Sequence, residues 1–312
     1  MAGQKNETLN VKVTDTSTLN LKSHELKILH HNVQSLNNKL LELSISLSID
    51  DINTDILCFS EHWLRENQLN SVYIDQFKLV SSFSRSIQKG GGSSIFVKNF
   101  LQTKEVDYLK GYGCENTFEL SAIELIDFNF ILICIYRSPD GNFDEFLSRL
   151  ESVICKVQSR GTNLFLCGDW NVNFLQHSSK LSELQNLLLM HNLVNTVKSP
   201  TRITHDTCTL IDVMITNLNR EMQTMIYDLG YSDHFAQVTS IKVDKPVLGP
   251  KSIKKRQFSD KAIKEFIYLL QKESWDQVLL LEDVNKSFDA FMTTFMYYFN
   301  ALFPKDILFK QQ

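Results

Sequence analysis

The sequence predicts an α/β protein whose core is a buried, partly antiparallel β-sheet. In two places along the 312 residues, short apolar runs alternate with amphipathic helical patterns. Between these places, apolar runs follow one another with only turns between them, which is typical of antiparallel strands and argues against a uniformly doubly wound Rossmann design. With 43% hydrophobic and 22% charged residues, the chain can bury a core of this kind.

The first strand, helix and strand are expected in the N-terminal quarter of the chain. The run LKILHHNVQS predicts a strand beginning near Leu26, LNNKLLELSISLSIDD repeats leucines at helical spacing, and DILCFSEHW is again apolar. Two further segments, FKLVSSFSRSIQKGGGSSIFVKN and TFELSAIELIDFNFILICIY, predict strands joined by turns.

A second alternation of strand and helix follows. FILICIYRSP predicts a buried strand, FDEFLSRLESVICKV has its apolar residues on one helical face, and NLFLCGDWN predicts a strand that ends in a turn. A helix in LSELQNLLLMHNL and strands in CTLIDVMITN and SDHFAQVTSIKV complete the pattern. This alternation favours an α/β architecture with a buried sheet.

We expect three parts: a flexible lead (1–23), a folded domain (24–245), and a basic linker with a helical extension (246–312). The lead is polar and has no lasting period. The extension begins with the basic cluster KSIKKRQF and continues in two helical patterns, the first with Ser259 as an N-cap candidate. The second pattern contains an apolar stripe, which we expect to pack on the main domain or on something outside this chain. The stripe comprises Phe288, Phe291, Phe295, Phe299 and Leu302.

Composition argues against several classes of protein. The formal net charge of −4 gives no overall attraction to nucleic acid, so we expect DNA binding by the isolated chain to be weak and salt-sensitive. No apolar segment reaches the roughly 18 residues that span a bilayer, and the N-terminus lacks an apolar signal-peptide core. We therefore expect an intracellular protein, nuclear or cytoplasmic, with no membrane partner. Six cysteines without C-x-x-C spacing argue against structural zinc and a disulfide framework.

Polar side chains able to bind a metal or transfer a proton follow the apolar runs. We expect them at the same end of successive strands, although Asp212 lies within its run. In sheet proteins with helical connections, ligands bind at the carboxyl ends of the strands. The set comprises Asn32, Glu61, Tyr136, Asp169, Asn171, Asp212, Asp233 and His234.

Three members of this set are hard oxygen ligands. Glu61, Asp233 and Asn32 suit Mg²⁺ and lack the His and Cys ligands that zinc favours. Such an ion would neutralise the charge that develops on a phosphodiester. Each residue also has a structural alternative, since Asn32 could cap the following helix and Glu61 could sit at a strand exit facing water. For one residue that alternative is the simpler one, but the ordered set favours a functional site.

The other members match the proton transfers of phosphoester hydrolysis. Asp169 is expected to orient or deprotonate the attacking water, and Asn171 to donate to a phosphate oxygen. His234 is expected to donate likewise if Asp212, otherwise a satisfied buried carboxylate, holds it charged and oriented. Tyr136 is a further donor to the phosphate or to the leaving oxygen.

Two arginines are the candidate substrate-binding residues. Arg137 follows a predicted strand end, and Arg85 lies between two predicted strands, where a solvated surface arginine is an equal alternative. The glycine-rich stretch KGGGSS lacks P-loop spacing and is expected to be a turn. His30 and His31 alternate along a strand, so at most one of them faces the site.

Six short motifs occur in order along residues 26–243: HNVQSLNNKL, CFSEHWL, IYRSP, GDWNVNF, TLIDVMITN and YSDHF. Together they resemble the signatures of the endonuclease/exonuclease/phosphatase superfamily, and more closely the apurinic-like endonuclease domains of LINE-type (non-LTR) retrotransposons. The resemblance implies a four-layer α/β sandwich with two mixed β-sheets. It also implies Mg²⁺-dependent nicking of double-stranded DNA that leaves a 3′-hydroxyl, with Mn²⁺ as the alternative ion.

In such elements that hydroxyl primes reverse transcription. The extension resembles the segment that leads into the reverse transcriptase there, so the implied partner is a reverse transcriptase domain in the same chain, with this sequence truncated before it. Two positions depart from the wider superfamily: Trp170 stands where phenylalanine is usual, and Gln34 stands where the abasic-site repair branch has an acid. The second departure favours the retrotransposon branch over abasic-site repair.

Two other functions are alternatives. Phosphomonoesterases and lipid phosphodiesterases share the fold, but they need a pocket for an inositol phosphate or a lipid head group, and no motif here indicates one. A catalytically silent fragment that acts as a binding module is the second alternative, and the complete set of polar residues argues against it.

Overall fold

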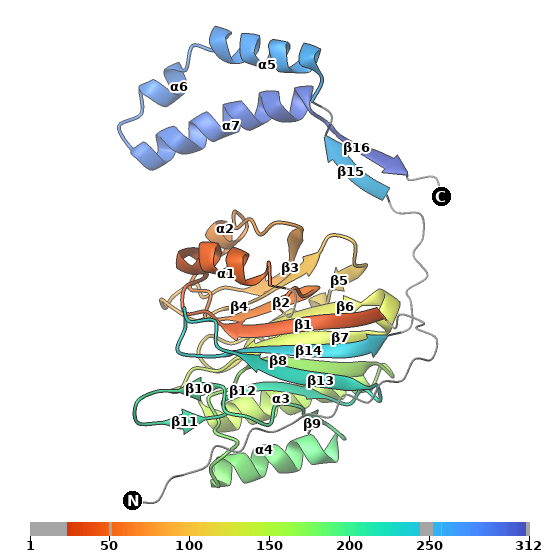
Figure 1. Ribbon diagram of the computed structural model, residues 1–312. Helices are drawn as coiled ribbons and strands as arrows, with labels where there is room; N and C mark the ends of the chain where they lie inside the picture. Colours follow the sequence, from red (N-terminus) through yellow and green to blue (C-terminus); the bar gives the residue numbers. More distant parts are fainter. Residues whose placement is uncertain (1–23, 50–51, 244–251, 257, 310–312) are drawn as a thin grey trace, which may run out of the picture. The chain divides into compact units, whose positions relative to one another are not determined.

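The computed structural model describes residues 24–49, 52–243, 252–256 and 258–309, which form two compact units, Met1–Pro246 and Val247–Gln312. The expected flexible lead and part of the expected linker lie outside the described residues. Figure 1 shows the first unit as two stacked β-sheets with helices at their outer faces.

The first sheet is mixed, with one parallel pair. Its strand order is β13 (Met222–Tyr227), β14 (Ala236–Val243), β1 (His24–Asn32), β2 (Ile56–Ser60), β4 (Ser93–Lys98) and β3 (Phe77–Phe83). β1 and β2 are parallel, with Asn32 opposite Ser60, and the other neighbouring pairs are antiparallel. The two strands that end in the motifs HHN and CFSE therefore end side by side.

The second sheet repeats this design. Its strand order is β5 (Thr103–Glu105), β6 (Glu119–Leu125), β7 (Phe130–Tyr136), β8 (Asn163–Asp169), β12 (Asp212–Thr216) and β9 (Val194–Asn195). β7 and β8 are parallel, whereas β12 runs antiparallel to β8 with Asp212 opposite Asp169. Asp212 is thus the first residue of its strand, and the antiparallel pairing places that start beside the end of β8.

Helices cover the outer faces and complete the four layers. α3 (Phe143–Gln158) and α4 (Ser179–Met190) share one core with the second sheet, whereas α1 (Leu40–Ser46) and α2 (Glu66–Leu69) share another with the first. The four-layer sandwich with two mixed sheets is confirmed. The helix expected over Leu36 to Leu47 begins as a 3₁₀ turn, η1 (Leu36–Lys39), before it becomes α1.

Several short elements have no clear signal in the sequence. β5, β9 and β13 are edge strands whose polar and apolar residues do not form an apolar run. The remaining short elements are a hairpin of β10 (Arg202–Ile203) and β11 (Cys208–Thr209), and the 3₁₀ turns η2 (Asp107–Tyr112) and η3 (Ile126–Phe128).

Alternate residues of the central strands face the opposite sheet. Ile28 and Cys58 join the large core between the sheets, while their neighbours Leu29 and Phe59 join the core beneath α1 and α2. At one end of the inter-sheet core, the inward-facing residue with which each central strand ends, or with which β12 begins, is polar instead of apolar. These residues are Asn32, Ser60, Tyr136, Asp169 and Asp212. This polar end of the inter-sheet core is therefore the candidate location of a functional site.

Within the described residues, the second unit contains three helices and a two-stranded sheet. Its elements are β15 (Ser252–Arg256), α5 (Asp260–Lys272), α6 (Asp276–Leu279), α7 (Val284–Leu302) and β16 (Lys305–Phe309). The helical extension is thus present, and Ser259 caps α5 by accepting a hydrogen bond from the Ala262 amide. The basic cluster expected as a linker contributes strand β15.

The apolar stripe of α7 packs inside its own unit. Phe291, Phe295 and Phe299 lie ring to ring along the helix, and the last two also contact Phe266 of α5. α5 thus supplies a facing aromatic ring, but the three side chains are only partly buried, so the expected packing on the main domain or on something outside the chain stays a prediction. Phe288 is different, since it is 60% exposed. No helix within the described residues is both long and apolar enough to cross a bilayer.

Gly168, the residue before Asp169, lies where the fold has no room for a side chain. Its φ is +141°, and a Cβ atom there would lie 1.8 Å from the Ile135 carbonyl oxygen. We expect Gly168→Ala to lower the free energy of unfolding by at least about 3 kcal/mol, because β7 and β8 must separate. Urea unfolding measures this change. Gly111→Ala is the control, because a Cβ atom there meets nothing within 4 Å, and equal destabilisation of both variants would contradict the prediction.

Candidate active site

The side chain of Asn32 joins groups from the two sheets. Its Nδ2 atom donates to Glu61 Oε1 and to Asp169 Oδ2, both at 2.9 Å. Asn32 is fully buried, so both hydrogens of its amide are used where water cannot replace the lost partners. The expected helix-capping role is not observed, because the capping position of η1 is Ser35 and it makes no side-chain capping bond. Asn32 is instead the centre of the polar cluster.

Glu61 lies on a strained loop directly after β2. Both Glu61 and Trp63 have left-handed φ angles, of 53° and 59°, which are unfavourable for side chains of their size. The Glu61 amide donates to the Gly92 carbonyl at 2.8 Å, and the Trp63 amide donates to that of Gly91 at 3.0 Å. Trp63 Nε1 donates to Glu61 Oε2 at 2.9 Å. The glycine stretch is a turn, as expected, and this turn holds the Glu61 loop in place.

A buried ion pair supports that glycine turn. Arg85 Nε donates to Glu119 Oε1 at 2.5 Å, and the other Glu119 oxygen accepts a hydrogen bond from the Gly92 amide. A Cβ atom at Gly91 would lie 2.2 Å from Arg85 Nε. Arg85 is only 8% exposed, so the alternative of a solvated surface arginine is wrong, while the expected role in substrate binding stays a prediction. The pairing with Glu119 could not be read from the sequence, because the two residues are 34 positions apart.

Asp169 is the buried carboxylate next to Asn32. Its Oδ1 atom accepts from the Asn171 amide at 3.0 Å, and its own amide lies 3.4 Å from Ser60 Oγ. Burial and the nearby charge of Asp212 raise the pKa of Asp169 to about 7. A carboxylate with a pKa near neutrality is a competent proton acceptor at physiological pH.

His234 and Asp212 form a buried ion pair. His234 Nδ1 lies 2.9 Å from Asp212 Oδ2, while Nε2 lies 4.0 Å from Asp169 Oδ2. Burial opposes the imidazolium, but the charge of Asp212 and its hydrogen bond outweigh burial and raise the pKa of His234 to about 9. For Asp212, burial favours the neutral acid, yet His234 holds its pKa below the usual value. His234 is therefore a cationic donor at neutral pH.

Tyr136 is the last residue of β7 and is almost fully buried. Burial is the main cause of its raised pKa, and the charges of Glu61 and Asp169 raise it further. The phenol therefore stays protonated and is a hydrogen-bond donor beside Glu61.

Arg137 and Asn171 are linked reciprocally, because the side chain of each donates to the backbone carbonyl of the other. The Arg137 guanidinium donates to the carbonyl oxygens of Trp170, Asn171 and Gly141 at 2.8 to 2.9 Å. Asn171 Nδ2 donates to the Arg137 carbonyl at 2.8 Å. Arg137 is 2% exposed and its contacts hold the Asn171 loop, so the expected contact with substrate stays a prediction.

Asp233 lies at the exposed side of the cluster. Its Oδ2 atom pairs with Arg202, at 2.8 Å from Nε and 2.5 Å from Nη2. Its Oδ1 atom is buried, has no hydrogen-bond partner and lies 4.0 Å from His234 Nε2. A buried carboxylate oxygen without a partner is an unusual cost in a folded protein, and a bound cation is one way to offset it.

The residues present fit a divalent cation. Asp169, Asp212 and His234 offer ligand atoms within 4.8 Å of one another and could hold an ion. His234 is a poor ligand while it is protonated and paired with Asp212, since a metal needs the neutral imidazole. The oxygens of Glu61 and Asn32 suit a hard ion better, because carboxylate and amide oxygens are the ligands that such an ion prefers.

The structure therefore brings most of the predicted set together. The residues linked by hydrogen bonds or distances up to 4.0 Å are Asn32, Glu61, Asp169, Asn171, Asp212, Asp233 and His234. Tyr136 joins them through its interaction with Glu61. Sequence reasoning missed Trp63 and Arg202. Trp63 lies inside the motif CFSEHWL and could have been noticed there, whereas nothing in the sequence pairs Arg202 with Asp233.

Comparison with known proteins agrees with the fold and the motifs. The family model described as "Endonuclease-reverse transcriptase" matches residues 130–238. The comparison with curated proteins finds no match. Among solved structures, the endonuclease domain of TRAS1, a telomere-specific non-LTR retrotransposon, is 18% identical with a TM-score of 0.57, covering 71% of this chain and 100% of that chain.

Two further structures share the fold. The AP endonuclease LMAP from Leishmania major is 11% identical with a TM-score of 0.55, covering 71% of this chain and 89% of its own. The 3′ phosphatase NExo from Neisseria, bound to a product DNA hairpin, is 17% identical with a TM-score of 0.51, and the match covers 70% of this chain and 99% of that chain. The resemblance to the endonuclease/exonuclease/phosphatase superfamily expected from the motifs is confirmed.

The His234–Asp212 pair predicts a defined pH dependence of stability. The pKa of His234 rises from 6.5 to about 9 on folding. The contribution of the protonated side chain to the free energy of unfolding is therefore complete below pH 6.5 and is lost as the pH rises through 9. Relative to His234→Gln, the wild-type free energy of unfolding should fall by about 3 kcal/mol across this window. Urea unfolding at a series of pH values with EDTA measures the difference.

The control for this prediction is His205→Gln, because the His205 side chain is 97% exposed. A wild-type advantage over His234→Gln that grows as the pH rises would contradict the assigned direction of the pKa shift.

Proposed function

We propose that this chain, with the fold and motifs of the endonuclease/exonuclease/phosphatase superfamily, is a metal-dependent DNA endonuclease that nicks one strand and leaves a 3′-hydroxyl. The observation that supports this most is the cluster centred on Asn32, which joins Glu61 to Asp169. In it, an oxygen-rich group suited to a cation lies beside a proton acceptor and a cationic donor. Metal-assisted phosphodiester hydrolysis uses all three.

The proposed ion is Mg²⁺, with Mn²⁺ as the alternative, held by Glu61, Asn32 and the free oxygen of Asp233. When bound, such an ion supplies positive charge that stabilises the phosphate during cleavage. Glu61 is kept in place by Asn32 on one side and Trp63 on the other, so its carboxylate does not need to reorganise. Preorganised groups lower the barrier more than mobile ones do.

The remaining residues act directly on the phosphodiester and on water. Asp169 is positioned by Asn32 and the Asn171 amide to orient the attacking water and accept its proton. His234, kept charged by Asp212, donates to a non-bridging phosphate oxygen. The phenol of Tyr136 is a second donor, because its raised pKa keeps it protonated.

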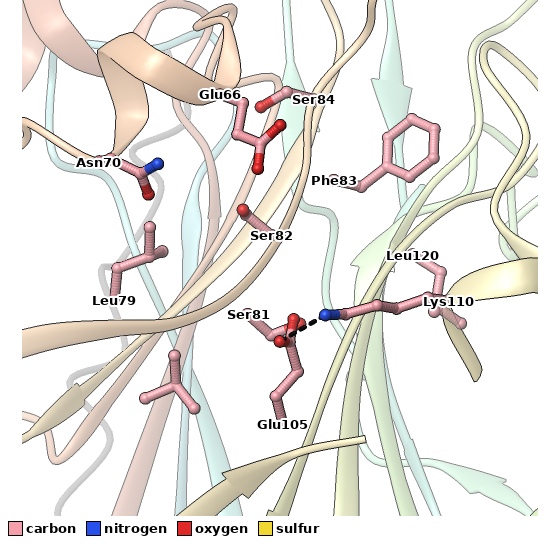
Figure 2. A pocket seen from close by; sticks show the side chains of 11 residues that line it. Glu66, Asn70, Leu79, Ser81, Ser82, Phe83, Ser84, Glu105, Lys110 and Leu120 are labelled. Atoms are coloured by element: carbon pink, nitrogen blue, oxygen red, sulfur yellow. Dashed lines mark ion pairs between the residues drawn. The ribbon is translucent and has the colours of Figure 1, made fainter. Parts of the chain in front are cut away.

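A phosphatase or lipid phosphodiesterase role has less support. The described residues include a pocket of about 430 Å³ between β3 and the β5–β6 region, and it shares no lining residue with the candidate active site (Figure 2). Its one basic side chain, Lys110, pairs with Glu105 at 2.6 Å, as the dashed line in Figure 2 marks, and Glu66 is a further acidic lining residue. The pocket therefore offers no uncompensated positive charge to an inositol phosphate.

DNA as the substrate and a retrotransposon context follow from the proteins that this chain resembles. One solved relative is titled as a non-LTR retrotransposon endonuclease, and another is titled as bound to a product DNA hairpin. By this analogy, a reverse transcriptase domain would use the 3′-hydroxyl as its primer and would be the partner in the same chain.

Supercoiled-plasmid nicking tests the proposed activity. The wild-type chain should relax the plasmid with Mg²⁺ and not with EDTA. Asp169→Asn and His234→Gln should each lower the rate by at least about 100-fold, because each removes a proton acceptor or donor at the reacting phosphate.

The matched controls are Asp206→Asn and His205→Gln, the same changes at side chains that are 86% and 97% exposed. Nicking that persists in EDTA would contradict the metal requirement. A folded wild-type chain that does not nick, but releases phosphate from a panel of phosphomonoesters or lipid phosphodiesters, would favour the alternative activity.

Binding to DNA by the chain alone should be weak and depend strongly on salt. The net charge of −4 provides no general attraction, so affinity must come from a few local phosphate contacts, each of which releases counterions. Fluorescence anisotropy of a labelled duplex, with Ca²⁺ in place of Mg²⁺, at about 50 and about 200 mM salt measures this. Tight binding that does not change with salt would be inconsistent with the prediction.

A further inference from the structure

Trp63 is a rigid, half-exposed aromatic ring at the edge of the candidate active site. Its side chain is 47% exposed, although it lies two residues from Glu61 and donates its indole N–H to that carboxylate. Core packing does not account for a ring with this much exposed surface. The hydrogen bond uses only the Nε1 edge of the indole.

The ring is fixed in orientation before any ligand arrives. The left-handed φ of 59° and the hydrogen bond from its amide to the Gly91 carbonyl hold the Trp63 backbone. The indole lies against Gly90, where an added Cβ atom would be 3.6 Å from Nε1. Together with the bond to Glu61, these contacts remove most of the rotational freedom that a ligand would otherwise have to restrict.

We propose that Trp63 contacts the substrate directly, by stacking on the base of a nucleotide next to the phosphodiester that the site cleaves. The inference rests on the proposed function and names the kind of DNA that the site prefers. A rigid tryptophan provides a flat apolar surface that accepts any base, so the contact adds affinity without reading sequence. The edge of the Trp63 ring is bonded to Glu61. A base stacked on this ring therefore lies next to the phosphate that binds at Glu61 and Asp169.

This geometry restricts the substrate. In an intact duplex each base is already stacked between its neighbours, so a base reaches a protein ring only where it is unpaired or has been turned out of the helix. The preferred substrate is therefore DNA whose nucleotide beside the cut is unpaired. A fully paired duplex must first bear the cost of unstacking that base.

The kinetic test compares two substrates of the same sequence, a duplex and a duplex with a short unpaired centre, using the full chain. Trp63→Ala should raise KM for the unpaired substrate by about 10-fold with a smaller change in kcat, because the stacking surface is lost. Trp63→Phe keeps a ring and should restore KM to within about 3-fold of wild type. Tyr73→Ala is the matched control, because Tyr73 is 76% exposed and takes no part in the site.

A second readout does not depend on cleavage. In a Trp275→Phe background, the two remaining tryptophans are Trp63 and Trp170, and Trp170 is fully buried, so the accessible fluorescence comes from Trp63. Titration with single-stranded DNA in EDTA should quench this fluorescence to saturation. Adding Trp63→Phe should abolish the quenching.

The two readouts separate this inference from the proposed function. A chain that never nicks DNA but shows saturable quenching would refute the proposed activity and support the stacking contact. Absence of quenching, or an unchanged KM in Trp63→Ala, would overturn the stacking contact even in an active endonuclease.

Discussion

The two hydrogen bonds donated by the Asn32 amide are the interaction on which the rest of the candidate site depends. They connect the carboxylate that follows β2 to the carboxylate that ends β8, so they set the spacing between the two sheets at the point where chemistry is possible. Asp169 Oδ2 left without this donor would be a buried, unsatisfied group, at a cost of about 1–3 kcal/mol. The sheets are therefore held together here by the polar groups that we propose as functional groups.

Burial between the two sheets also sets the pKa values of the acids and of His234 in the site. Asp169 and Asp212 lie opposite each other on β8 and β12, and two buried carboxylates this close do not ionise independently. His234 bonds to Asp212, which stays ionised, while the pKa of Asp169 rises towards neutrality. Neighbouring acids thus acquire different proton affinities from their surroundings, which suits one to the proposed role of a fixed counter-charge and the other to that of a proton acceptor.

Sequence reasoning succeeded where local pattern determines structure. The apolar runs that end in Asn32, Glu61 and Asp169 are strands, because buried β-strands need such runs. Parallel pairing of β1 with β2 brings the first two ends together, and the stacking of the two sheets brings Asp169 to them. Sequence reasoning could not find the partners of Arg85 and Arg137, because a long charged side chain can reach many partners and only the fold decides which. The contact of the α7 aromatic stripe with Phe266 could not be predicted for a similar reason, since that ring lies on a helix whose docking no local pattern reveals.

The most direct test of this account is a crystal structure of the chain grown with Mn²⁺, in which anomalous scattering locates the ion. The account predicts a peak within ligand distance of a Glu61 carboxylate oxygen and of Asn32 Oδ1, with Asn32 Nδ2 still bonded to Asp169. A well-ordered cluster with no peak beside Glu61, or a peak held only by Asp169, Asp212 and a deprotonated His234, would contradict the assignment of the metal position and of His234 as a cationic donor.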